Sequence, residues 1–103
     1  MTPERRLQTK IVKAIKDEAN EQGIDVEIIK MHGNMYSAGW PDLCVLVGDP
    51  ISPPEVVFLE VKCPRRRPTA RQEAKLTRLR QLGFSAEVVT SILRALGLMP
   101  WTQ

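Results

Sequence analysis

The sequence has little cysteine, few aromatic residues and no long hydrophobic run. Its two cysteines do not form a disulfide framework and no secretory signal pattern is present, which favours a reducing, cytoplasmic setting. The longest continuous apolar stretch, residues 43–47, is far shorter than the roughly 20 residues that cross a membrane. Two cysteines and one histidine cannot form a zinc site without another ligand. We therefore expect a soluble protein without membrane contact, and we expect no organic cofactor.

The length and the hydrophobic pattern favour one α/β domain over residues 1–103. A chain of 103 residues, 43% of them hydrophobic, can bury about two-thirds of its unfolded surface, which is enough for one core. Thr2 and Pro3 predict the start of a helix and Gly23 its end, and Thr69 and Gly83 delimit a second helix. The predicted elements are a helix at 3–23, strands at 24–31, 43–47 and 56–62, a helix at 70–82, a strand at 84–90 and a short helix at 91–98, with loops at 32–40 and 48–54. This α-β-β-β-α-β-α order predicts a central mixed β-sheet flanked by helices.

Positive charge is concentrated in one segment. Residues 62–80 hold eight of the 15 basic residues and one of the 12 acidic residues. Such a concentration is typical of a surface that binds a polyanion, usually nucleic acid. A solvated basic helix face is the alternative interpretation.

Two carboxylates and a lysine stand at the ends of apolar strands. Asp42 follows the turn Gly39-Trp40-Pro41, and Glu60 and Lys62 lie at the end of the strand at 56–62. Strand side chains alternate, so Glu60 and Lys62 share one face, and they meet Asp42 if the two strands are neighbours. Two adjacent carboxylates suit Mg²⁺, with the backbone carbonyl of Val61 as a further ligand. The alternative is a surface salt bridge between Glu60 and Lys62.

These residues resemble a known nuclease family. Gly39-Trp40-Pro41-Asp42-Leu43, Phe58-Leu59-Glu60-Val61-Lys62 and Thr69-Ala70-Arg71-Gln72 resemble the PD-(D/E)XK nuclease superfamily and, more narrowly, its VRR-NUC family, including standalone members from phages and bacteria. The resemblance extends from Glu4 to about Ser91. It implies a restriction-endonuclease-like fold and Mg²⁺- or Mn²⁺-dependent hydrolysis of phosphodiester bonds in a bacterial cell or a phage-infected host. It also implies a homodimer that acts on branched DNA, in the manner of Holliday-junction resolvases.

The resemblance also assigns roles to five side chains. Asp42 and Glu60 match the metal ligands, and Lys62 the catalytic lysine. Glu4 matches an N-terminal glutamate that is a further candidate ligand, and Gln72 a glutamine on the helix after the lysine. Two of these have structural alternatives, because Glu4 can stabilise a helix N-terminus through the helix dipole and Gln72 can complete a capping box with Thr69.

Several features of the sequence stay open. Glu18 also follows the apolar stripe of the first helix and competes with Glu4. Cys63-Pro64-Arg65 stands where relatives carry a glycine, which leaves the loop after Lys62 undefined. Trp40 either stacks on a base or packs on the sheet, and His32 is either solvated or a base or ligand. The apolar C-terminal residues complete the core or contact a second subunit: Leu93, Leu96, Leu98, Met99 and Trp101.

The sequence therefore favours a metal-dependent endodeoxyribonuclease that selects DNA by its structure. The basic side chains expected to hold phosphates are Arg65, Arg66, Arg67, Arg71, Lys75 and Arg78. Contacts of this kind carry little sequence information. A non-catalytic DNA-binding or recombination accessory module with the same fold is the alternative, and an RNA nuclease would differ only in its substrate.

Overall fold

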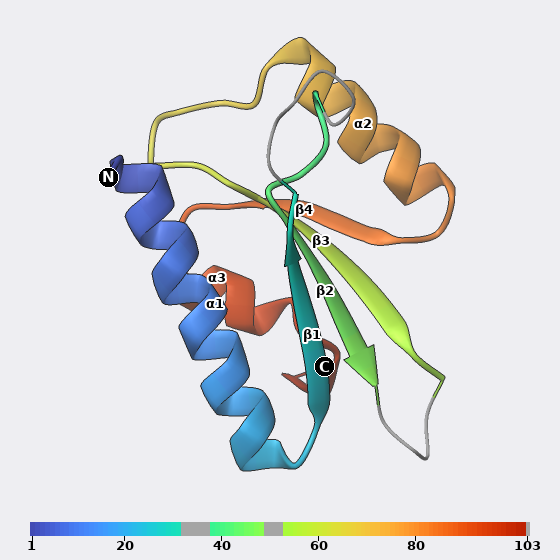
Figure 1. Ribbon diagram of the computed structural model, residues 1–103. Helices are drawn as coiled ribbons and strands as arrows, with labels where there is room; N and C mark the ends of the chain where they lie inside the picture. Colours follow the sequence, from blue (N-terminus) through green and yellow to red (C-terminus); the bar gives the residue numbers. More distant parts are fainter. Residues whose placement is uncertain (32–37, 49–52, 103) are drawn as a thin grey trace.

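The structure, a computed structural model, describes residues 1–31, 38–48 and 53–102. It contains a four-stranded mixed β-sheet with helices on both faces (Figure 1). The element order is the predicted α-β-β-β-α-β-α, followed by a short 3₁₀ helix. His32 and most of the loop predicted at 32–40 lie outside the described residues, as does the central part of the loop predicted at 48–54. In the described part of the chain, no helix is long and apolar enough to cross a membrane.

The first helix, α1, spans Pro3–Gln22 and begins and ends as predicted. The hydroxyl of Thr2 accepts a hydrogen bond from the backbone N–H of Arg5 at 3.2 Å, which satisfies one of the free donors of the first turn. Gly23 ends the helix at φ +70°, a left-handed conformation that glycine adopts at low cost. The buried side of the helix carries Ile11, Ile15 and Ala19.

The sheet has the strand order β1-β2-β3-β4. The strands are β1 (Asp25–Lys30), β2 (Leu43–Gly48), β3 (Glu55–Val61) and β4 (Ser85–Val89), each within one or two residues of its predicted bounds. The first three strands are antiparallel to one another, and β3 and β4 are parallel. Leu43 pairs with Leu59, so the same register places Asp42 opposite Glu60.

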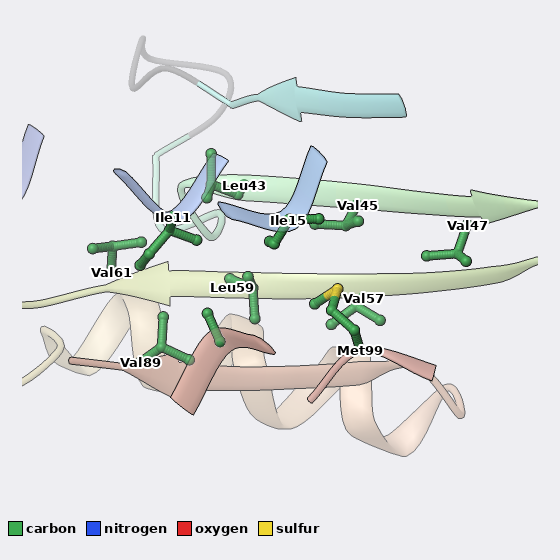
Figure 2. Close-up of a cluster of buried hydrophobic side chains, with 11 residues drawn as sticks. Ile11, Ile15, Leu43, Val45, Val47, Val57, Leu59, Val61, Val89 and Met99 are labelled. Carbon is green, nitrogen blue, oxygen red and sulfur yellow. The ribbon is translucent and has the colours of Figure 1, made fainter. Parts of the chain in front are cut away.

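Alternation along β3 produces two separate cores. Val57, Leu59 and Val61 face α1 and the C-terminal elements, in a cluster that also contains Ile11 and Met99 (Figure 2). On the other face, the buried cluster consists of Cys44, Phe58, Leu76, Leu79 and Ala86. Burying each large side chain contributes about 1.5–3 kcal/mol. Glu60 lies two positions after Phe58 on β3 and therefore projects from the same face of the sheet, the one that the second helix covers.

The remaining helices cover opposite faces of the sheet. Helix α2 (Ala70–Gln81) carries Leu76 and Leu79 against one face, and α3 (Ile92–Gly97) lies with α1 on the other. The 3₁₀ helix η1 (Pro100–Thr102) was not predicted. Its Trp101 Nε1 donates to Glu18 Oε1 at 2.6 Å, and Met99 beside it is fully buried. Met99 and Trp101 therefore complete the core, whereas Leu93 stays 82% exposed.

Candidate active site

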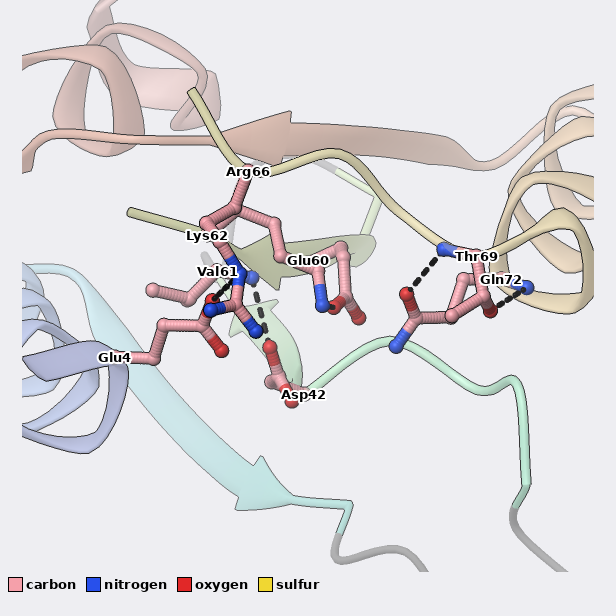
Figure 3. Close-up of polar contacts among 8 residues, drawn as sticks. All are labelled: Glu4, Asp42, Glu60, Val61, Lys62, Arg66, Thr69 and Gln72. Atoms are coloured by element: carbon pink, nitrogen blue, oxygen red, sulfur yellow. Dashed lines mark hydrogen bonds and ion pairs between the residues drawn. The ribbon is translucent and has the colours of Figure 1, made fainter. Parts of the chain in front are cut away.

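Asp42, Glu60 and Lys62 converge at one end of the sheet, as the sequence predicts (Figure 3). Asp42 immediately precedes β2, Glu60 is the last residue but one of β3, and Lys62 follows that strand. The turn that leads to Asp42 packs against α2: a Cβ added at Gly39 would lie 2.8 Å from Cγ of Arg71. Since Gly39 also has φ +86°, this close approach requires glycine.

The carboxylate of Asp42 is fixed by the backbone of β3. Its Oδ2 accepts a hydrogen bond from the N–H of Val61 at 2.8 Å. The N–H and C=O groups of one strand residue point to the same side, so the carbonyl of Val61 is directed toward this edge of β3 as well. Asp42 and the Val61 carbonyl can therefore contribute oxygen atoms to the same place.

Glu60 is a buried carboxylate with one free oxygen. The residue is 1% exposed, and its Oε2 lies 3.3 Å from Nζ of Lys62. Its Oε1 is buried and has no hydrogen-bond partner among the described residues. A buried polar atom without a partner costs free energy, so this oxygen is well suited to accept a bond from a cation or a hydrogen-bond donor.

Burial and crowding of charge raise the pKa values of both acids. Burial, followed by the negative charge of Asp42, raises the pKa of Glu60 to about 7, against the opposing effect of Lys62. Burial also raises the pKa of Asp42, although the Val61 N–H and Lys62 lower it. The single positive charge of Lys62 thus does not neutralise the negative charges of Asp42 and Glu60.

Glu4 approaches this pair from the first turn of α1. Its charge contributes to the raised pKa of both Asp42 and Glu60, so it lies within electrostatic range of them. Glu4 Oε1 is buried without a hydrogen bond, and Nε of Arg66 lies 3.9 Å from it. The competing candidate, Glu18, is instead bonded to Trp101. Of the two candidate acids of α1, Glu4 is therefore the one near the site.

The loop after Lys62 turns in a way that the sequence did not define. The N–H of Arg66 donates to the carbonyl of Cys63 at 3.0 Å, and Arg65 has φ +75°. With Pro64 in the second position, this is a type II turn, whose third position favours glycine. Arg65 therefore holds a strained conformation that costs about 1 kcal/mol. The turn directs Arg66 toward Glu4, a contact that sequence spacing gave no means to foresee.

Gln72 forms the capping box that was its structural alternative. Its Oε1 accepts from the N–H of Thr69 at 2.8 Å, and its own N–H donates to the Thr69 hydroxyl at 3.2 Å. Figure 3 shows the amide nitrogen of Gln72 on the side of Glu60 and Asp42. The capping bond engages the oxygen of the side-chain amide and leaves its NH₂ group for an interaction at the site.

The basic residues of α2 form a stripe. Arg71, Lys75 and Arg78 are spaced i, i+4 and i+7, which places them on one side of the helix. Lys75 Nζ lies 4.5 Å from the centre of the Trp40 ring, and Trp40 packs on Phe58 at a ring distance of 6.1 Å. Within the described residues, five of the predicted phosphate-binding cations have no ion-pair partner: Arg65, Arg67, Arg71, Lys75 and Arg78.

The donor set fits a hard divalent cation. Two carboxylates and a backbone carbonyl provide oxygen ligands and leave other positions to water, as Mg²⁺ and Mn²⁺ prefer. The free Oε1 of Glu60 and the excess of negative charge are the observations that support this fit. In the described part of the chain, no three acidic, histidine or cysteine side chains lie close enough to hold one ion together. Glu4 is therefore placed beside the Asp42–Glu60 pair and not in a three-acid cluster with it.

The raised pKa of Glu60 predicts a pH-dependent loss of stability. Between pH 4.5 and about 7 the folded protein keeps a proton that the unfolded chain has released, so stability falls as the pH rises through this range. In metal-free buffer, Glu60→Gln should therefore stabilise the protein at pH 8, by on the order of 2 kcal/mol, and have little effect at pH 4.5. Thermal unfolding with a chelator present measures both values.

A matched control is Glu87→Gln, because Glu87 is partly exposed and pairs with Arg80 on the surface. It should not reproduce the pH-dependent gain. A Glu60→Gln protein that unfolds at a lower temperature than the unsubstituted protein at pH 8 contradicts the electrostatic description of the site.

Comparison with known proteins identifies the family and the fold. Residues 4–92 match the family described as "VRR-NUC domain". A solved structure titled "VRR_NUC domain" is 28% identical, with a TM-score of 0.63 over 95% of this chain and 95% of that chain. A search of curated proteins finds no significant match. A family match over 4–92 includes Asp42, Glu60, Lys62 and Gln72, and it begins at Glu4; the chain therefore belongs to the VRR-NUC family, a family of nuclease domains that act on DNA.

Proposed function

We propose that the protein is a Mg²⁺- or Mn²⁺-dependent endodeoxyribonuclease of the PD-(D/E)XK type, similar to the standalone VRR-NUC proteins of phages and bacteria. The observation that carries the proposal is the pair formed by half-buried Asp42 and buried Glu60, whose Oε1 has no partner among the described residues and whose Oε2 lies 3.3 Å from the Lys62 ammonium. A catalytic module would have a reason to bury two carboxylates together, whereas a DNA-holding module would not. Burial of Glu60 and the nearby charge of Asp42 both raise the pKa of Glu60, so the arrangement is costly without a cation.

Each side chain has a separate task in the proposed hydrolysis. Asp42, Glu60 and the Val61 carbonyl would hold a divalent cation, which would polarise a phosphate and lower the pKa of a water molecule. The ammonium of Lys62 donates hydrogen bonds to the attacking water or to the phosphate oxygens, where negative charge develops in the transition state. Gln72 offers its free NH₂ group to the same phosphate or water. Glu4 positions Arg66 or an outer water molecule.

Structure selectivity follows from the type of contact available. The cations of the 62–80 segment, above all the Arg71, Lys75 and Arg78 stripe, suit backbone phosphates, which are the same in every sequence. We therefore propose that branched DNA, such as a four-way junction, is the preferred substrate. The protein would then work on bends and branch points in a bacterial cell or a phage-infected host.

The proposal predicts metal-dependent cleavage that requires Lys62. With Mn²⁺, the purified protein should cut four-way-junction and flapped DNA faster than linear duplex DNA. Lys62→Ala should lower the rate about a hundredfold or more, because it removes a cation placed next to the developing charge. Gel analysis of end-labelled substrates measures these rates, and anisotropy measures DNA binding in parallel.

Lys16→Ala is the matched control, because Lys16 is exposed on α1 and should leave both cleavage and binding unchanged. Cleavage by Lys62→Ala at the unsubstituted rate contradicts the assigned role. Tight binding to junctions without cleavage in any divalent metal would favour the accessory-module alternative instead.

We also propose that the active form is a homodimer, because two cuts on one branched substrate are made most simply by two sites. Sedimentation at micromolar concentration should give a dimer of the 11.6 kDa chain, either alone or on a junction. A monomer in both conditions contradicts this assembly without affecting the proposed chemistry.

A further inference from the structure

A small hollow bordered by basic residues lies near the Asp42–Glu60 pair. It has a volume of about 220 Å³ and is lined by Arg5, Gln8 and Thr9 of α1, by Lys30 at the end of β1, and by Met1. Two cations from separate elements thus border one small cavity. Neither lies in the 62–80 segment, so the concentration of charge in the sequence does not point to them.

The position of this hollow ties it to the site. Met31, which follows Lys30, donates its N–H to the carbonyl of Asp42 at 2.8 Å. Gln8 lies about one helical turn after Glu4, whose charge reaches Asp42 and Glu60. The hollow therefore adjoins the acidic pair on its α1 side. Figure 1 shows α1 and α2 on opposite sides of the sheet, so the stripe on α2 lies on the other side of the pair.

The charges around the hollow are available to a ligand. Arg5 and Lys30 are exposed, and neither has an ion-pair partner within the described residues. The Gln8 amide adds hydrogen-bond donors, whereas the Thr9 hydroxyl already donates to the Arg5 carbonyl at 3.0 Å. Two cations and an amide around a small cavity match an anion with several acceptor oxygens, such as a phosphodiester.

The opposite end of the same strand has the opposite charge. A hollow of about 370 Å³ there is lined by Asp25, Glu27 and Glu55 and by no basic residue. β1 thus runs from an acidic hollow at its start to a basic hollow at its end. A polyanion would be repelled from the acidic hollow and attracted to the basic hollow. The basic hollow is at the end of β1 where Asp42 and Glu60 lie.

We propose that the hollow formed by Arg5, Gln8 and Lys30 binds a backbone phosphate of the DNA on the α1 side of the catalytic pair. The inference rests on the proposed function, since it requires DNA to pass over Asp42 and Glu60. The nucleic acid is then held on both sides of the cut, by this hollow and by the stripe on α2. Such a two-sided grip fixes the scissile phosphate between two anchor points.

The test measures binding without cleavage. The affinity of the intact chain for a labelled four-way junction is determined by anisotropy in EDTA at several salt concentrations. The Arg5→Ala/Lys30→Ala variant should bind about tenfold more weakly, and the slope of log K against log salt should fall by about 0.9, the value of one phosphate contact. Arg5→Lys/Lys30→Arg keeps both charges and should restore most of the affinity.

The matched control is Lys13→Ala/Lys16→Ala, which removes two charges from exposed positions farther along α1 and should change neither value. Unfolding temperatures of all variants establish that they are folded.

The inference is overturned if Arg5→Ala/Lys30→Ala and the unsubstituted protein have equal affinity and equal slope. This holds even if Arg71→Ala/Lys75→Ala weakens binding and the proposed function stands. Competition by inorganic phosphate alone, with no difference in DNA binding between variants, overturns it as well. An unsubstituted protein that binds no DNA contradicts the proposed function and this inference together.

Discussion

The close approach of the Asp42 and Glu60 carboxylates at the end of the sheet is the constraint on which the rest of the structure depends. Asp42 and Glu60 are brought together by the antiparallel register of β2 and β3, and the Val61 N–H holds Asp42 in place. Burial first, and then the negative charge of Asp42, raises the pKa of Glu60 to about 7. The fold tolerates this pair because the neighbouring side chains Leu43 and Leu59 are fully buried in the core.

One strand supplies both the core and the chemistry. In β3 every second residue faces α1, and those residues form the larger apolar cluster. The residues between them face α2. On that face the strand carries the apolar residues Val56 and Phe58 and then the acidic residue Glu60. Continuing this alternation beyond the strand brings Lys62 to Glu60. The strand that stabilises the sheet therefore also buries Glu60, which strengthens the electrostatic interactions of that carboxylate.

Local chemistry made most of the fold predictable. Thr2, Thr69 and Gly23 fixed helix ends because caps are recognised within three or four residues, and alternation identified Glu60 and Lys62 as neighbours on one face. The contacts that escaped prediction join distant segments. Trp101 bonds to Glu18 across 83 positions, and Arg66 lies 3.9 Å from Glu4 after a turn in which Arg65 adopts a left-handed conformation. No periodicity encodes such contacts, since they depend on how loops pack after the elements have formed.

The proposed nuclease activity requires that the Asp42–Glu60 pair binds a divalent cation. The most direct measurement is a crystal structure of the protein grown with Mn²⁺, with anomalous differences recorded to locate the metal. We expect a peak between the carboxylates of Asp42 and Glu60, within about 2.0–2.3 Å of their oxygens and of the Val61 carbonyl. A well-ordered site that contains only water, with both carboxylates in place and Mn²⁺ in excess, would contradict it.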